Sequence, residues 1–198
     1  MILSRPTPRL PGIQPMLAAF LSAAIFSLLG TSVVMGSQYS LDKGAPIPPM
    51  PVMGTNGQPV NLNSLKGRVT LISIVPQLNT PVCDEQTHRF SEQNGGLDQF
   101  MTFVTLSTNT YEDQQAFANK AHIHNMTFLS DAPEYHFGSA TGLLLPELSI
   151  LQRTVVILDS TGIIRYVEKV SLGQLPDIEQ ALRVSRTLLE THSEGVMP

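Results

Sequence analysis

Residues 69–83 read Val69-Thr70-Leu71-Ile72-Ser73-Ile74-Val75-Pro76-Gln77-Leu78-Asn79-Thr80-Pro81-Val82-Cys83. The apolar, β-branched run at the start lies between Gly67 and Pro76, and it predicts a short buried strand rather than a helix. Thr80 is a candidate N-cap, and Pro81 has the fixed φ of a first helical residue. A helix is therefore expected from Pro81 to the stop signal Asn94-Gly95-Gly96.

Cys83 is the only cysteine of the chain and falls in the first turn of this predicted helix. Unpaired backbone N–H groups and the helix dipole favour a thiolate there, whereas the neighbouring Asp84 and Glu85 oppose it. Two interpretations stay open: a reactive nucleophile, or a small buried apolar side chain, which is the commonest fate of a free cysteine. In either case no disulfide can form within one chain.

Pro76, Thr80 and Cys83 have the spacing of the peroxiredoxin active-site motif, and the sequence resembles that family. Thr80-Pro81-Val82-Cys83-Asp84-Glu85-Gln86-Thr87, followed by Arg89-Phe90, is similar to its thiol peroxidase branch in particular. The resemblance extends from about Ser40 to about Leu189. It includes four further segments in the order and spacing that the family uses: residues 128–131, 137–138, 153–159 and 162–168.

The resemblance implies roles for four residues. Cys83 is expected to be the peroxidatic nucleophile that becomes a sulfenic acid, and Thr80 to orient the thiolate and the peroxide through its hydroxyl. Pro76 is expected to shield the pocket from water, and Arg153 to stabilise the thiolate and bind peroxide oxygen. Such chemistry needs a thiolate and donors already in place for the departing oxygen. The alternatives are an arginine reaching solvent at a strand end, and an ordinary helix cap and first-turn proline.

The sequence departs from the family at the resolving cysteine. Thiol peroxidases usually carry this second cysteine in the segment that corresponds to residues 107–118, and here Ala118 occupies its position. A sulfenic acid on Cys83 is therefore expected to be resolved from outside, by a thioredoxin-like or glutaredoxin-like protein, a small thiol, or Cys83 of another subunit. Slow resolution would expose it to sulfinic and sulfonic acid formation. The resemblance also implies a homodimer.

The N-terminus carries a different signal. Residues 16–35 contain no charge and follow Arg5 and Arg9, so they predict a hydrophobic helix just long enough to span a bilayer with its basic end in the cytoplasm. Residues 1–36 are then either a cleaved signal peptide or a membrane anchor. The remainder, residues 37–198, forms one domain that is expected to lie outside the cytoplasm, in the cell envelope or periplasm.

The pattern of elements predicts an α/β thioredoxin fold with an N-terminal β-hairpin. Strands are expected at 69–75, 100–106 and 126–129, with helices at 81–93, 112–122 and 177–190 and a short helix or loop at 134–141. The hairpins are 52–60, around Asn56-Gly57, and 154–168, across residues 159–162. A formal net charge of −4 argues against nucleic-acid binding.

Two functions from different classes remain. One is a peroxidase that reduces hydrogen peroxide and small organic hydroperoxides, and the other is a non-catalytic redox sensor or binding module on the same scaffold. No cofactor and no metal are expected. The histidines lack cysteine or acidic partners at metal-binding spacing and are interpreted as surface or helix-end residues; they are His88, His122, His124 and His136.

Overall fold

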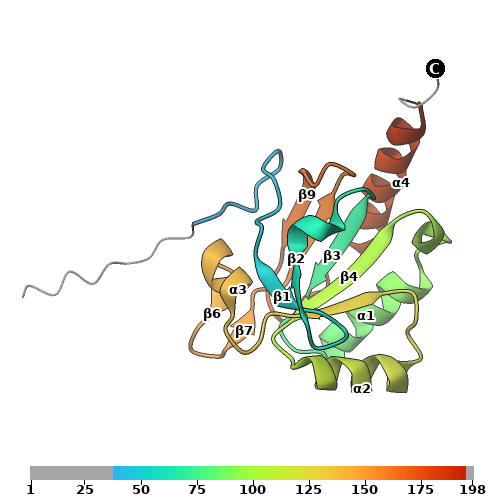
Figure 1. Cartoon of the computed structure of the whole chain (residues 1–198). Coiled ribbons are helices and arrows are strands. Elements are labelled where there is room, and N and C mark those ends of the chain that lie inside the picture. Colours follow the sequence, from blue (N-terminus) through green and yellow to red (C-terminus); the bar gives the residue numbers. More distant parts are fainter. Residues whose placement is uncertain (1–37, 195–198) are drawn as a thin grey trace, which may run out of the picture. The chain divides into compact units, whose positions relative to one another are not determined.

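A computed structural model of the chain describes residues 38–194 (Figure 1). The predicted hydrophobic helix at 16–35, and with it the choice between signal peptide and anchor, lies outside the described residues. Among residues 38–194, no helix combines the length and the apolar character needed to cross a membrane.

A seven-stranded mixed sheet forms the centre of the domain, in the order β2-β1-β5-β4-β3-β8-β9 (Figure 1). Strands β3, β4 and β5 run parallel, whereas β8 pairs antiparallel with β3 and β9 antiparallel with β8. The strands are β1 (Pro51–Met53), β2 (Pro59–Asn61), β3 (Thr70–Ile74), β4 (Thr102–Ser107), β5 (Thr127–Ser130), β8 (Thr154–Leu158) and β9 (Ile164–Lys169).

A helix follows each parallel strand, as the alternating pattern of the sequence predicts: α1 (Pro81–Glu92), α2 (Tyr111–Ala121) and α3 (His136–Thr141). A fourth helix, α4 (Ile178–Glu194), follows the antiparallel β9, and short 3-10 helices occur at Leu62–Leu65 and Leu97–Gln99. The N-terminal hairpin is also confirmed, since Val52 pairs with Val60. One hairpin was not predicted: β6 (Leu144–Leu145) and β7 (Ile150–Leu151) form a separate small sheet.

Successive side chains along each strand point to opposite faces of the sheet, so the apolar core consists of two clusters, one on each face. On one face, Leu71, Phe103 and Val155 pack in a cluster with residues of α1, α2 and α4. On the other, Ile72, Val104 and Val156 pack with α3 and the entry segment, through Phe137, Leu41 and Ile47. Because both faces are covered, all five residues of the central strand β3 are buried.

Asp131 follows β5 and is buried beside the start of α3. Its two carboxylate oxygens accept the backbone N–H groups of Phe137 at 2.8 Å and Gly138 at 2.7 Å. Burial nevertheless raises the pKa of Asp131 to about 6. A carboxyl with a raised pKa contributes stability at low pH, below its unfolded pKa of about 4, and this contribution is lost as the pH rises through about 6.

An Asp131→Asn protein tests this titration, because the variant cannot ionise at that position. We expect the free energy of unfolding of the wild type, minus that of the variant, to fall by up to about 3 kcal/mol between about pH 4 and about pH 7. Urea unfolding of both proteins across this range measures the difference, and other titrating groups cancel in it. A difference that does not change with pH would contradict the prediction.

Candidate active site

Cys83 lies where the central strand of the sheet leads into a helix. After β3 the chain passes through residues 75–80, and α1 begins at Pro81, so Cys83 stands in the first helical turn as predicted. Its side chain is completely buried. The surrounding apolar cluster includes Leu78, Phe90 and Val155, which come from the loop, from α1 and from β8.

Arg153 reaches the sulfur from the neighbouring strand. It immediately precedes β8, whose Thr154 pairs with Ile74 at the end of β3. Arg153 Nη2 lies 3.2 Å from Cys83 Sγ, and the side chain is only 1% exposed. The interpretation of Arg153 as a solvent-facing strand-end residue is therefore wrong, and the residue contacts the cysteine as the resemblance implies.

The charge of Arg153 has no carboxylate partner. The ion pairs among the described residues are His88–Asp84, Arg165–Asp159 and Arg183–Glu179, so Arg153 takes part in none of them. Its other hydrogen bonds go to neutral oxygens, namely the Leu172 carbonyl and Gln86 Oε1. Because an unpaired buried cation is costly, the site is suited to an anion placed beside the guanidinium.

Gln86 is a site residue that the sequence reasoning missed. It is fully buried one turn after Cys83 and accepts a hydrogen bond from Arg153 Nη1 at 2.6 Å. Its Nε2 donates to Ser73 Oγ on β3 at 2.8 Å. The amide thus ties the guanidinium to the central strand. The only signal in the sequence was a polar residue three positions after the cysteine, where both share a helix face.

Thr80 occupies the predicted N-cap position, but its hydroxyl does not cap the helix. The backbone there is extended, with φ −113° and ψ 146°, and no side-chain cap hydrogen bond forms. Instead Thr80 Oγ1 donates to the Gln77 carbonyl at 3.0 Å. Pro76 is buried, and its carbonyl accepts a hydrogen bond from Thr108 Oγ1 at 3.3 Å. The prediction of an ordinary threonine cap was wrong in this detail.

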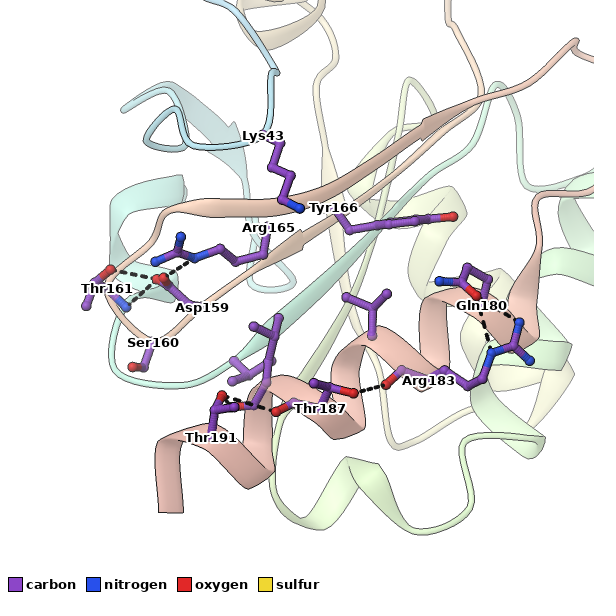
Figure 2. Close-up of a pocket in the computed structure, with 13 residues that line it drawn as sticks. Lys43, Asp159, Ser160, Thr161, Arg165, Tyr166, Gln180, Arg183, Thr187 and Thr191 are labelled. Atoms are coloured by element: carbon purple, nitrogen blue, oxygen red, sulfur yellow. Dashed lines mark hydrogen bonds and ion pairs between the residues drawn. The ribbon is translucent and has the colours of Figure 1, made fainter. Parts of the chain in front are cut away.

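Figure 2 shows a groove of about 780 Å³ beside α4. It is bounded by Val69 just before β3, by the turn between β8 and β9, and by residues 180–191 of α4. Lys43, Arg165 and Arg183 contribute cations to its walls. Cys83 follows the other end of β3 and does not line this groove.

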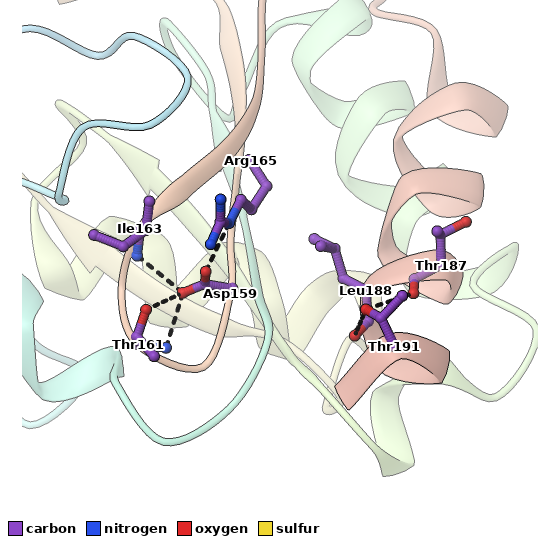
Figure 3. A network of polar contacts seen from close by, with 7 residues as sticks. All are labelled: Asp159, Thr161, Ile163, Arg165, Thr187, Leu188 and Thr191. Carbon is purple, nitrogen blue, oxygen red and sulfur yellow. Dashed lines mark hydrogen bonds and ion pairs between the residues drawn. The ribbon is translucent and has the colours of Figure 1, made fainter. Parts of the chain in front are cut away.

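Asp159 organises the turn that forms one side of this groove (Figure 3). Its Oδ1 accepts hydrogen bonds from Thr161 and from the Ile163 N–H, and its Oδ2 accepts one from Arg165 Nε at 2.7 Å. Burial acts to raise the pKa of Asp159, but these hydrogen bonds outweigh it and the net pKa is lowered. The same turn closes the β8–β9 hairpin that positions Arg153.

No cluster of three or more histidine, cysteine or acidic residues that could hold a metal ion occurs among residues 38–194. His122 and His136 are exposed, and His88 is partly buried and lies 3.4 Å from Asp84 Oδ1. Among residues 38–194, the side chain that hydrogen-bonds the sulfur is that of Arg153, which Gln86 holds.

Comparison with known proteins places this arrangement in a family. A family model described as Redoxin matches residues 42–182. The thiol peroxidase of Halalkalibacterium halodurans is 34% identical over 164 residues, which are 82% of this chain and 93% of that protein. The thiol peroxidase of Bacillus subtilis is 31% identical over 165 residues, which are 83% of this chain and 93% of that protein. The chain belongs to the peroxiredoxins, in the thiol peroxidase branch.

A solved structure extends the likeness of this peroxiredoxin to its fold. The crystal structure of a peroxiredoxin-like protein from Aquifex aeolicus matches with a TM-score of 0.69 and 28% identity, covering 77% of this chain and 90% of that chain. The predicted thioredoxin-type α/β fold of the domain is thereby confirmed. The peroxiredoxin is an oxidoreductase of the thiol-dependent peroxidase class.

Substitution of Gln86 tests how the peroxiredoxin holds its arginine. A Gln86→Met protein keeps the volume but leaves Arg153 Nη1 without its acceptor, and kcat/KM for peroxide is expected to fall about tenfold or more. A Gln86→Glu protein keeps an acceptor for Nη1 but pairs Arg153 with a carboxylate, which competes with the sulfur for the guanidinium charge, so its activity should also fall. Steady-state peroxide consumption by the three proteins measures both effects. Wild-type kcat/KM in the Gln86→Met protein would argue against a positioning role for this hydrogen bond.

Proposed function

We propose that this peroxiredoxin reduces hydrogen peroxide and small organic hydroperoxides by a one-cysteine mechanism, with Cys83 as the peroxidatic residue. The observation that carries the proposal is the 3.2 Å contact between Arg153 Nη2 and Cys83 Sγ in a buried site without any carboxylate on the arginine. A permanently charged guanidinium beside a lone thiol favours the form of sulfur that attacks peroxide.

In the first half of the cycle, the Cys83 thiolate attacks one oxygen of the peroxide. An S–O bond forms as the O–O bond breaks, the sulfur becomes a sulfenic acid, and the departing alkoxide or hydroxide takes up a proton to leave as alcohol or water. Negative charge gathers on the departing oxygen, and Arg153 is the donor positioned to stabilise it. Pro76, which is buried in the loop between β3 and α1, would keep water from the sulfur.

Thr80 would act as an acceptor in this step. Its single hydroxyl hydrogen is directed to the Gln77 carbonyl, so the lone pairs of Oγ1 remain for the O–H group of an incoming hydroperoxide. A hydrogen bond of this kind would point the peroxide hydrogen away from the sulfur. Thr80 then orients the substrate, while Arg153 stabilises the charge that develops on it.

In the second half of the cycle, an external thiol attacks the sulfenic sulfur and releases water. The mixed disulfide is then cleaved by a further thiol, which returns Cys83 to the thiolate. Cys83 is the only cysteine of the chain, and Ala118 stands at the resolving position, so both thiols must come from other molecules. The candidates are a thioredoxin-like protein, a glutaredoxin-like protein, a small thiol, or a second subunit if the protein is a homodimer.

The test is a comparison of thioredoxin, glutaredoxin and glutathione systems as reductants in one peroxidase assay, with mass spectrometry of Cys83 after stoichiometric peroxide. Fast turnover with at least one system, and one added oxygen on Cys83 before reductant is supplied, would support the proposal. A sulfenic acid that persists with every reductant would instead support the non-catalytic sensor. Unmodified Cys83 would contradict both functions.

An Ala118→Cys protein should change the fate of the oxidised sulfur. Ala118 on α2 and Cys83 on α1 belong to the same buried cluster, and a disulfide needs their Cβ atoms within about 4.5 Å. After peroxide we expect an internal disulfide in this variant and less sulfinic acid than in the wild type. Mass spectrometry under non-reducing conditions measures both. Equal sulfinic acid in the two proteins would count against Ala118 as the resolving position.

The N-terminal segment suggests where the enzyme works. The uncharged stretch at 16–35, preceded by Arg5 and Arg9, supports a leader or anchor over residues 1–36 and a peroxidase domain over residues 37–198 outside the cytoplasm. Fractionation of expressing cells into cytoplasm, membrane and periplasm, with the molecular mass of the recovered chain, would separate a cleaved leader from a retained anchor. Recovery of the full-length chain in the cytoplasm would contradict export.

A further inference from the structure

The loop that leads from β3 to Cys83 is attached to the rest of the domain by a neighbouring segment. Its Leu78 N–H donates to Asn109 Oδ1 at 2.9 Å, and its Pro76 carbonyl accepts Thr108 Oγ1 at 3.3 Å. Both partners belong to the short connection between β4 and α2. Thr108 and Asn109 therefore form a clasp on the backbone of the cysteine loop.

Asn109 is itself held firmly in place. Its Oδ1 accepts a second hydrogen bond, from Ser107 Oγ at 3.1 Å, and its carbonyl accepts one from Ser130 Oγ at 2.6 Å. Gln114 Nε2 donates to Ser107 Oγ at 2.9 Å and to the Leu129 carbonyl at 2.8 Å. Side chains from β4, β5 and α2 thus hold the backbone and the side chain of Asn109, whose side-chain acceptor receives the loop N–H.

The loop before Cys83 has few other attachments to the rest of the domain. Gln77, Asn79 and Pro81 are exposed, whereas the Leu78 side chain is fully buried. Cys83 Sγ is also fully buried, so a thiol carried by another protein cannot approach the sulfur in line with its S–O bond until residues 77–82 move outward. The strength of the clasp therefore sets how often the sulfur becomes accessible.

We propose that Asn109 is a positioning residue that controls access of the external thiol to Cys83, by holding the Leu78 N–H and with it the loop in the closed arrangement. With the loop closed, Arg153 contacts the sulfur and peroxide can be reduced. With the loop open, the sulfenic acid can react with a reductant. This role rests on the proposed one-cysteine cycle for its biological meaning, but the opening itself is a property of the folded chain and is measurable without any turnover.

Because Cys83 is the only cysteine, alkylation of the reduced protein reports on this sulfur alone. We expect an Asn109→Leu protein, which loses the acceptor but keeps the volume, to be alkylated by a bulky maleimide about fivefold faster than the wild type, the factor that corresponds to loss of one hydrogen bond. Asn109→Asp keeps an acceptor for both Leu78 and Ser107 and should react at the wild-type rate. Thr108→Val should give a smaller increase than Asn109→Leu.

Thr110→Ala is the matched control for general loss of stability. Thr110 Oγ1 caps α2 by accepting the Asp113 N–H, and it has no hydrogen bond to the cysteine loop. This variant should be destabilised but alkylated at the wild-type rate. Thermal unfolding by circular dichroism checks that each variant is folded. If Asn109→Leu does not fold, the Thr108→Val protein carries the test, with faster alkylation than Thr110→Ala expected.

Kinetics of the two half-reactions complete the experiment. In Asn109→Leu the rate constant for reduction of the sulfenic acid by a thiol should rise by about the same factor as the rate of alkylation. The rate constant for oxidation of Cys83 by peroxide should not rise. Alkylation of Asn109→Leu at the wild-type rate, or of Asn109→Asp at the rate of Asn109→Leu, would overturn the role of Asn109. If the wild type lacked peroxidase activity but the alkylation rates followed the expected order, the proposed function would fail and the clasp would stand.

Discussion

A Cys83→Ser protein is expected to consume peroxide no faster than buffer does, with any reductant. A serine hydroxyl is protonated at neutral pH and has no base beside it to take its proton, because Arg153, which bonds the side chain of residue 83, is a donor and the surrounding cluster is apolar. The chain has no other cysteine to substitute for it. Peroxide consumption, followed with the reductant that works best for the wild type, measures the loss.

The control for this variant is the folded state of the protein. Serine is close in size to cysteine, so the circular dichroism spectrum and the pairing of β3 with β8 should be preserved. Mass spectrometry should find no added oxygen at position 83 under conditions that oxidise the wild type. Substantial peroxidase activity in the Cys83→Ser protein would rule out the peroxidatic role and would leave the site without a nucleophile.

Replacement of Arg153 should have the next largest effect. An Arg153→Met protein loses both the charge beside the thiolate and the donor for the departing oxygen, and kcat/KM for peroxide is expected to fall by a factor of about 10² to 10³, the usual cost of removing such a donor. Arg153→Lys keeps a positive charge but not the fork that contacts Cys83, Gln86 and Leu172 together. It should fall between the methionine variant and the wild type.

Alkylation separates the two contributions of Arg153. Loss of the charge beside the sulfur should slow alkylation of Cys83 in Arg153→Met, and less in Arg153→Lys. A further loss of rate that is seen with peroxide but not with the alkylating reagent then reports the missing donor for the departing oxygen. Wild-type kcat/KM in the methionine variant would show that neither contribution matters.

The strand β3 and the helix that carries Cys83 could be predicted because their signals are local. A β-branched run between glycine and proline, and a threonine and proline at a helix start, do not depend on distant parts of the chain. The hairpin β6–β7 escaped because each of its strands has two residues, too few for any periodicity. Its neighbours on either side were placed correctly despite this omission.

The candidate site could be predicted only in part, because its contacts join segments that are far apart in the sequence. The contact between Arg153 and Cys83 depends on the antiparallel pairing of β8 with β3, which the residues alone do not indicate, and it was expected through the family resemblance. Gln86 was missed because a glutamine within a helix is ordinarily a surface residue. It is buried here because the guanidinium and Ser73 satisfy both ends of its amide.

Because β3 is buried, amides that exchange slowly with deuterium should lie close in the sequence to amides that exchange rapidly. Every residue of β3 is buried and lies between paired residues of β4 and β8, so its amides should exchange with deuterium only when the whole domain unfolds. The exposed Gln77 and Asn79, which follow a few residues later, should exchange through small local openings. Cys83 is therefore expected to lie close to a boundary between slowly and rapidly exchanging parts of the backbone, with only a few residues between them.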